Sequence, residues 1–111
     1  MTELWTKNFL LSDILAGRKT LEVRVKEGDV GRVRAGERIV LKSESRRVSV
    51  RVDDVREYRT FDAMLGTEPY TAIASAARSN GHVLGELRRI YSREREAKGV
   101  VVFQISDPTA A

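Results

Sequence analysis

The fold is decided by the stretch Gly17-Arg18-Lys19-Thr20-Leu21-Glu22-Val23-Arg24-Val25, where a glycine precedes a strict alternation of polar and apolar side chains. Alternation with a period of two predicts a β-strand that has one face on a core. The core-facing side chains are Leu21, Val23 and Val25, and the opposite face carries Thr20, Glu22 and Arg24. Working outward from this strand, we expect further strands and short helices.

Four other segments are predicted to be extended. Residues 47–55 alternate in the same way, residues 38–42 form a further extended stretch, and the polar loop between them indicates a hairpin. Residues 100–105 form a continuous apolar run, which is typical of a buried strand. Leu4-Trp5 is suited to a short strand or lead-in. The sequence therefore predicts five or six strands.

Three or four short helices are expected from apolar residues at helical spacing. They cover residues 9–16, 61–65, 68–77 and 83–91. Asn8 and Thr60 are suited to cap the N-termini of the first two, and Gly17 is suited to end the first. We expect residues 107–111 to form a frayed tail.

The order of these elements favours a mixed β+α fold. Strands come first, helices follow and one strand closes the chain, which is not the alternation of a doubly wound sheet. We therefore expect a small antiparallel β-barrel closed by the C-terminal strand, with the helices at its periphery. A chain of 111 residues has the size of one domain, so residues 1–111 are expected to form a single one.

Composition excludes several kinds of chemistry. The chain has no cysteine and one histidine, His82, which rules out disulfides, thiolate sites and a histidine-rich zinc site. We expect neither a metal nor another cofactor. The apolar run at residues 100–103 is too short to span a bilayer, and the first residues do not form a signal peptide. We expect no membrane partner, and a cytoplasmic location.

Positive charge is concentrated in the first half of the chain. The net charge is +4, yet residues 18–59 contain 13 basic against 8 acidic side chains. A basic surface attracts phosphates and makes nucleic acid a candidate partner. Arg46, Arg47 and Arg51 are the candidate phosphate contacts, because they follow one another along the predicted hairpin. The alternative is an ordinary solvated face.

The first strand also gathers the most informative polar residues. A cation, a hydroxyl, a carboxylate and a guanidinium lie within six positions, at Lys19, Thr20, Glu22 and Arg24. A glutamate can accept from an exocyclic amine, while lysine or arginine can bind an acceptor or a phosphate. The same residues would also fit a solvated strand face with a weak ion pair.

The chain resembles the ASCH family, a group within the PUA-like superfamily of β-barrels. Residues 17–24 match the family's Gly-x-Lys-x-x-Glu-x-Arg signature. Weaker support comes from the Tyr-x-x-Phe-x-x-x-Leu pattern of residues 58–65 and from the closing run 99–105. The resemblance covers nearly the whole chain, in the right order.

This resemblance implies a barrel with a cleft that holds RNA or a nucleotide-like ligand. The signature residues Lys19, Glu22 and Arg24 would line the cleft, with Thr20 beside them. As aromatic residues, Trp5 and Tyr58 are candidates to stack on a base, and packing in the core or at the barrel end is the alternative for both. Glu68 is the candidate for a more distant glutamate that some members use.

Two alternatives remain open at this stage. Some relatives are amidohydrolases that deacetylate 4-acetylcytidine, and others are ribonucleases, so Lys19 and Glu22 are the catalytic candidates if the chain is a hydrolase. The amidohydrolases carry a threonine three residues after the lysine, where this chain has Glu22, which puts a threonine-based mechanism in doubt. The other alternative is a protein-interaction domain with an empty cleft.

Overall fold

The computed structural model describes residues 1–111 and contains one five-stranded sheet. The strands are β1 (Glu3–Trp5), β2 (Leu21–Val25), β3 (Arg38–Lys42), β4 (Arg47–Tyr58) and β5 (Val100–Ala110). The helices are α1 (Asn8–Leu15), the 3₁₀ helix Gly28–Arg32, α2 (Phe61–Leu65), α3 (Tyr70–Ile73), α4 (Asn80–Ile90) and α5 (Arg93–Glu96). None of these helices has both the length and the apolar character that crossing a membrane requires.

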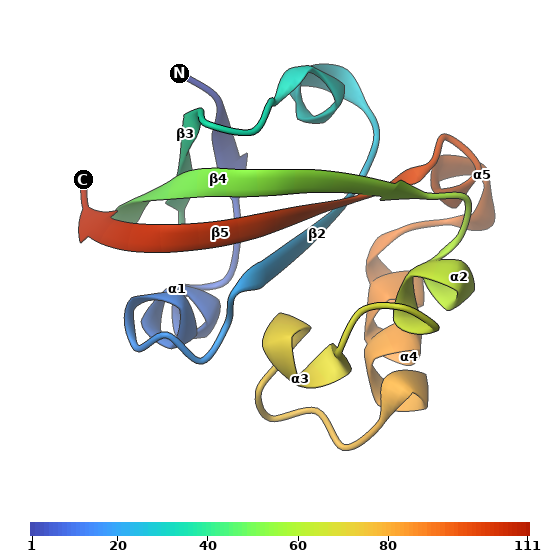
Figure 1. The fold of residues 1–111 in the computed structure, drawn as a ribbon. Coiled ribbons are helices and arrows are strands. Elements are labelled where there is room, and N and C mark those ends of the chain that lie inside the picture. Colours follow the sequence, from blue (N-terminus) through green and yellow to red (C-terminus); the bar gives the residue numbers. More distant parts are fainter.

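The sheet curls into a half-barrel with the strand order β1-β3-β4-β5-β2 (Figure 1). All neighbouring strands are antiparallel except β1 and β3, which run parallel. The two edge strands, β1 and β2, are therefore the ones that face the opening of the curl. The predicted class, a barrel-like β+α fold, is confirmed, with more short helices than expected.

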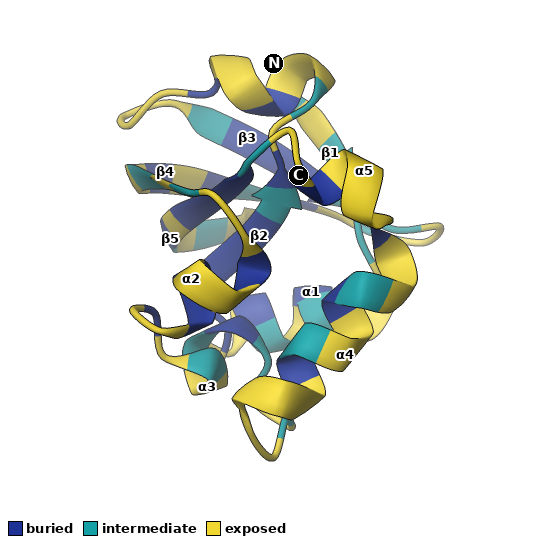
Figure 2. Ribbon diagram, turned by 90° about the vertical axis from the view of Figure 1, so that its right-hand side faces the viewer, coloured by how far each residue is buried: buried dark blue, intermediate teal, exposed yellow.

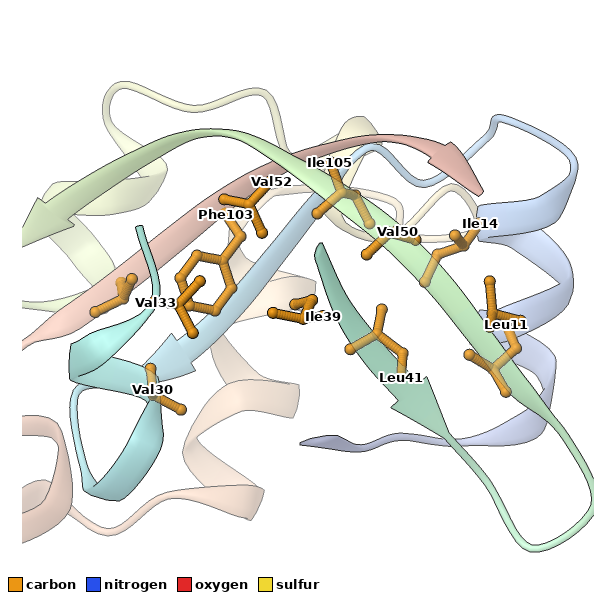
Figure 3. Close-up of a cluster of buried hydrophobic side chains, with 12 residues drawn as sticks. Leu11, Ile14, Val30, Val33, Ile39, Leu41, Val50, Val52, Phe103 and Ile105 are labelled. Atoms are coloured by element: carbon orange, nitrogen blue, oxygen red, sulfur yellow. The ribbon is translucent and has the colours of Figure 1, made fainter. Parts of the chain in front are cut away.

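One core fills the concave side of the sheet. The alternating apolar side chains of β3 and β4 meet those of β5, and α1 and the 3₁₀ helix cover them (Figure 3). Phe103 lies in the middle of this cluster and is completely buried. Each buried aliphatic or aromatic side chain contributes roughly 1.5–3 kcal/mol relative to an exposed one, so this cluster holds the curl together.

A second core lies between β2, β5 and the helices. Leu21, Val23 and Val25 face this core, as predicted, and pack with residues of α2 and α4 such as Met64 and Leu87. β5 supplies Val100 and Val102 here and Val101 and Phe103 to the other core. Because β5 is buried on both faces, its sequence is a continuous apolar run rather than an alternating one.

The helix expected to reach residue 77 ends at Ile73. The carbonyl of Ile73 accepts a hydrogen bond from Lys19 Nζ at 2.7 Å. The N–H of Ala77, which would bond to this carbonyl in a continuous helix, donates to Ala74 O instead. Ala74 is extended, with φ −144° and ψ 102°. A tertiary contact from the first strand thus replaces the next helical hydrogen bond.

The tail expected at residues 107–111 is instead ordered as the end of β5. Ala110 pairs with Val48, and Ala111 N–H donates to Arg47 O. Arg38 holds Asp107 through its carboxylate at 2.9 Å and its carbonyl at 2.7 Å. β4 is longer than predicted, because it continues to Tyr58, and it pairs with β5 along most of its length.

Helix α1 begins at Asn8 without a side-chain cap, contrary to the expectation for this residue. Asn8 Oδ1 instead accepts a hydrogen bond from Arg46 Nε at 2.8 Å. The expected glycine stop is present, since Gly17 follows the helix with φ +77°. Thr60 caps α2 as predicted, with its side chain accepting from Ala63 N–H.

Candidate functional site

A cleft of about 560 Å³ runs along the outer edge of β2, between β1 and α1 on one side and α4 on the other. In Figure 2 the helices α1 and α4 lie below the curled sheet, with β2 above them. The cleft walls are mostly apolar and come from four separate segments of the sequence, within residues 5–10, 19–24, 73–77 and 82–91. They include Trp5, Phe9, Val23, Ala77, Leu87 and Ile90.

The cleft has unusually exposed apolar side chains among its lining residues. Trp5 is 58% exposed, Phe9 61% and Ile90 56%. Exposed apolar side chains that gather around a cleft are a feature that ligand-binding surfaces share. Lys7 also lines the cleft, is exposed, and its ammonium makes no ion pair.

Three charged residues of the signature lie together in the same cleft. Glu22 is only 4% exposed and binds one cation with each oxygen. Its Oε1 lies 3.2 Å from Lys19 Nζ, and its Oε2 accepts from Arg24 Nε at 2.9 Å and Nη2 at 2.6 Å. The alternation of the strand places Glu22 and Arg24 on one face, and the loop after α1 brings Lys19 to them.

Every proton of the Lys19 ammonium is used within the chain. Besides Glu22, Nζ donates to the carbonyls of Leu21 and Ile73, both at 2.7 Å. An ammonium has three N–H groups, so these three acceptors satisfy it. Lys19 therefore joins β2 to the end of α3.

Arg24 connects the two edges of the half-barrel. Its Nη2 donates to the carbonyl of Trp5 at 2.7 Å as well as to Glu22, so β2 is joined to β1 across the opening. The Tyr91 hydroxyl also lies beside the guanidinium, and both residues line the cleft. Arg24 thus holds Trp5 in place at the cleft.

The charge state of the site follows from these contacts. Burial alone would raise the pKa of Glu22, but the charges of Arg24 and Lys19 outweigh it, and the pKa lies below its ordinary value. Burial likewise raises the pKa of the Tyr91 hydroxyl, which also lines the cleft. At neutral pH Glu22 is an acceptor, and it has no proton to give.

His82 is the remaining titratable side chain of interest in the cleft. It lies in the first turn of α4, and its Nδ1 accepts a hydrogen bond from Arg78 N–H at 3.2 Å. In the neutral ring the proton is then on Nε2, which makes this nitrogen a donor.

The other ligand-binding candidates lie apart from the cleft. Thr20 is exposed on the same face as Glu22 but does not line the cleft, and its N–H donates to Ala72 O. Tyr58 and Glu68 form a separate cluster with Arg56, which binds the Glu68 carboxylate with two nitrogens at 2.6 and 2.8 Å. The structure thus brings Lys19, Glu22 and Arg24 together and leaves Tyr58 and Glu68 outside.

The three candidate phosphate contacts are all paired within the chain. Arg46 binds Asn8 and Ser12 of α1, with its Nη2 2.6 Å from Ser12 Oγ. Arg47 binds Glu3 at 2.6 Å. Arg51 binds Asp53 at 2.8 Å.

Sequence reasoning missed two exposed residues of the cleft, Phe9 and Ile90, whereas the sequence already indicates Trp5 as a candidate to stack on a base. Phe9 and Ile90 belong to helical apolar stripes that read as core. Which part of such a stripe stays exposed depends on how the helix meets the sheet. No local signal in the sequence could have identified them.

The comparisons with known proteins agree with this architecture. The family model described as ASCH domain matches residues 5–109. No curated protein matches the chain. The structure of ASCH from Zymomonas mobilis has a TM-score of 0.67 at 11% identity, with 97% of this chain and 68% of that chain covered, and so shares the fold.

Two smaller proteins are more similar. The crystal structure of hypothetical protein PH0355 has a TM-score of 0.86 at 27% identity, covering 96% of this chain and 97% of the other. The solution NMR structure of protein PF0455 from Pyrococcus furiosus has a TM-score of 0.76 at 28% identity, covering 96% of both chains. Since the family model spans nearly all of the chain, the protein belongs to the ASCH domain family.

Proposed function

We propose that this ASCH domain binds RNA or a nucleotide, with a nucleobase held in the cleft along β2. The observation that carries the proposal is the combination of exposed Trp5 and Phe9 with the buried ion cluster of Lys19, Glu22 and Arg24 in one cleft. A base has an apolar face and a polar edge, and this cleft offers a matching surface for each.

Aromatic side chains supply the affinity for a base without selecting its identity. Stacking of a base on an aromatic side chain contributes about 1–3 kcal/mol. Trp5 is preorganised for this role, because Arg24 binds its carbonyl and Lys42 lies over its ring, 5.7 Å from the centroid. Lys7 supplies an unpaired cation beside the aromatic residues, where a phosphate attached to the base would lie.

A path for the phosphate backbone leads away from Trp5 across the outer face of the sheet. Trp5 is paired with Lys42, and Lys42 with Arg47, so the three lie in one row across β1, β3 and β4. Glu3 now neutralises both cations, at 2.9 and 2.6 Å. All three phosphate contacts stay predictions, and Arg47 is the one of them that lies in this row.

The hydrolase alternative gains less support from the geometry. The Lys19 ammonium donates all its protons within the chain, so none points to a developing oxyanion. Glu22 is ionised and held by two cations, which makes it a weak base and excludes it as a general acid in this state. The same contacts suit a rigid binding site.

The single tryptophan of the chain provides the test. We expect the fluorescence of Trp5 to change when single-stranded RNA of mixed sequence is added, with an affinity that falls as salt rises. Phe9→Ala should weaken binding about tenfold, in keeping with the loss of one stacking contact. Leu15→Ala is the matched control, since Leu15 is an exposed residue of the same helix that does not line the cleft.

The outcomes separate the proposal from its alternatives. Equal affinities of Phe9→Ala and wild type would show that RNA binds elsewhere. No fluorescence change with RNA or with any of the four nucleoside monophosphates would contradict the proposal and favour a protein partner.

A further inference from the structure

The cleft contains a short piece of unpaired strand edge at Val23. Hydrogen bonds from Ile105 N–H to Thr20 O and from Lys26 N–H to Gly99 O, both 2.9 Å, fix which residues of β2 bond to β5. Backbone hydrogen bonding alternates along an antiparallel pair of strands. Glu22 and Arg24 therefore hydrogen-bond to β5, whereas the backbone N–H and C=O of Val23 point away from β5 toward the open edge of β2. No backbone group of the chain pairs with the Val23 N–H or C=O, and Val23 lines the cleft.

The edge is occupied on both sides of Val23. Before it, the Leu21 carbonyl accepts from Lys19 Nζ. After it, the Val25 carbonyl accepts from Glu27 N–H at 2.9 Å, and the Tyr91 hydroxyl hydrogen-bonds the backbone of Val25. The free edge is therefore one residue long. A peptide strand added here would gain only the two hydrogen bonds of Val23, too few for a stable extension of the sheet.

One donor and one acceptor on the same residue suit a small planar ligand. An unpaired N–H or C=O away from bulk water costs free energy, which a ligand recovers by pairing with it. The hydrogen-bonding edge of a nucleobase carries a donor next to an acceptor, such as the amino group and ring nitrogen of adenine or cytosine. The side chains of Val23 and Leu87 would contact the flat ring beside that edge.

We propose that the Val23 backbone N–H and C=O pair with the donor–acceptor edge of the bound base, and so fix its orientation and select against a base in which that edge is blocked. This inference rests on the proposed nucleobase site and adds the element of specificity to it. Aromatic contacts accept any base, whereas a fixed donor and acceptor reject a base whose matching groups are absent or blocked.

The test uses the full ¹⁵N-labelled chain and the four ribonucleoside 5′-monophosphates. The nucleotide that binds best is then compared with its analogue in which the base donor is methylated. We expect the Val23 amide to shift and to exchange more slowly with solvent in the complex, and methylation to weaken binding about tenfold. The Glu22 amide, already bonded to β5, is the internal control and should keep its exchange rate.

Two failures are distinguishable. If a nucleotide shifts the Trp5 indole signal while Val23 exchange is unchanged and the methylated analogue binds equally well, the base lies in the cleft but Val23 does not read it. If neither the four nucleotides nor single-stranded RNA perturbs any cleft signal, the proposed function is wrong and this inference fails with it.

Discussion

Two buried glutamates, Glu22 and Glu68, are each clamped by an arginine, yet only one of them lies at a cleft. Glu22 is 4% exposed and Glu68 7%, and both have a pKa below the ordinary value. For Glu68 the first cause is the hydrogen bond from Arg56, while for Glu22 the charges of Arg24 and Lys19 overcome burial. The chemistry of the two clusters is alike.

Their surroundings differ. The Glu22 cluster borders the open edge of β2 and exposed aromatic side chains, and Arg24 lines the cleft. The Glu68 cluster ties the segment before α3 to β4, and Arg56 also binds Asp54 and Gln104. A buried ion pair is therefore no sign of a binding site by itself. The neighbouring unpaired backbone and exposed apolar groups make the difference.

The largest expected effect is a loss of folding stability that is greater for a change in the Glu22 cluster than in the Glu68 cluster. Glu22→Gln leaves two buried cations without a counter-charge, which costs about 3–5 kcal/mol. Glu68→Gln should cost less, roughly 1–3 kcal/mol, because Arg56 keeps its hydrogen bonds to Asp54 and Gln104. Urea denaturation of both variants beside wild type measures the difference. Equal losses would show that the Glu22 cluster is no more demanding than an ordinary structural ion pair.

Acidification should act on the same cluster. Because the folded pKa of Glu22 is lowered, its ionised form stabilises the fold above its ordinary value of 4.5, and this contribution is lost as pH falls through the lowered pKa. The stability gap between wild type and Glu22→Gln should therefore narrow below about pH 4.5. Urea midpoints at pH 7 and pH 3 provide the measurement. A gap that widens on acidification would mean that Glu22 is protonated in the fold at neutral pH.

Of the two clusters, only the one at the cleft should affect binding when it is changed. Arg24→Lys keeps the charge beside Glu22 but loses the bond to the Trp5 carbonyl, so RNA affinity should fall about tenfold. Arg56→Lys is the same change in the other cluster and should alter affinity less than twofold. Titration of Trp5 fluorescence compares them, and a similar loss in both variants would indicate a general loss of structure.

The smallest expected effect concerns the outer face. Arg47→Ala should lower the slope of log affinity against log salt concentration by about one, as expected when one phosphate contact is lost. The affinity itself should fall only a few-fold. Arg59→Ala, an exposed arginine beyond the opposite end of β4, is the control. An unchanged salt slope in Arg47→Ala would remove the row of Trp5, Lys42 and Arg47 from the proposed phosphate path.

Local patterns were sufficient to predict most of the sheet. The extended stretch predicted at residues 38–42 matches β3, and the buried run after Gly99 matches the start of β5. The errors lie where a distant contact decides: Lys19 ends α3 at Ile73, and Arg38 together with β4 orders the last residues. Such contacts join residues more than fifty positions apart, and no short window of sequence contains them.

The candidate site could be predicted only in part. Residues on one strand face, such as Glu22 and Arg24, share a site by geometry alone. Glu68 belongs elsewhere because α2 and α3 carry it to Arg56, which the sequence does not indicate. The unpaired edge at Val23 depends on the order of strands in the sheet, and that order is a property of the whole fold.

The most direct test of the nucleobase site is amide and indole chemical-shift mapping of the ¹⁵N-labelled chain with single-stranded RNA. The account predicts shifts at Trp5, Val23 and Arg24 that saturate together, while Tyr58 and the Glu68 amide stay unchanged. Shifts confined to the Arg56–Glu68 cluster or to the outer face, with Trp5 and Val23 unmoved, would contradict it.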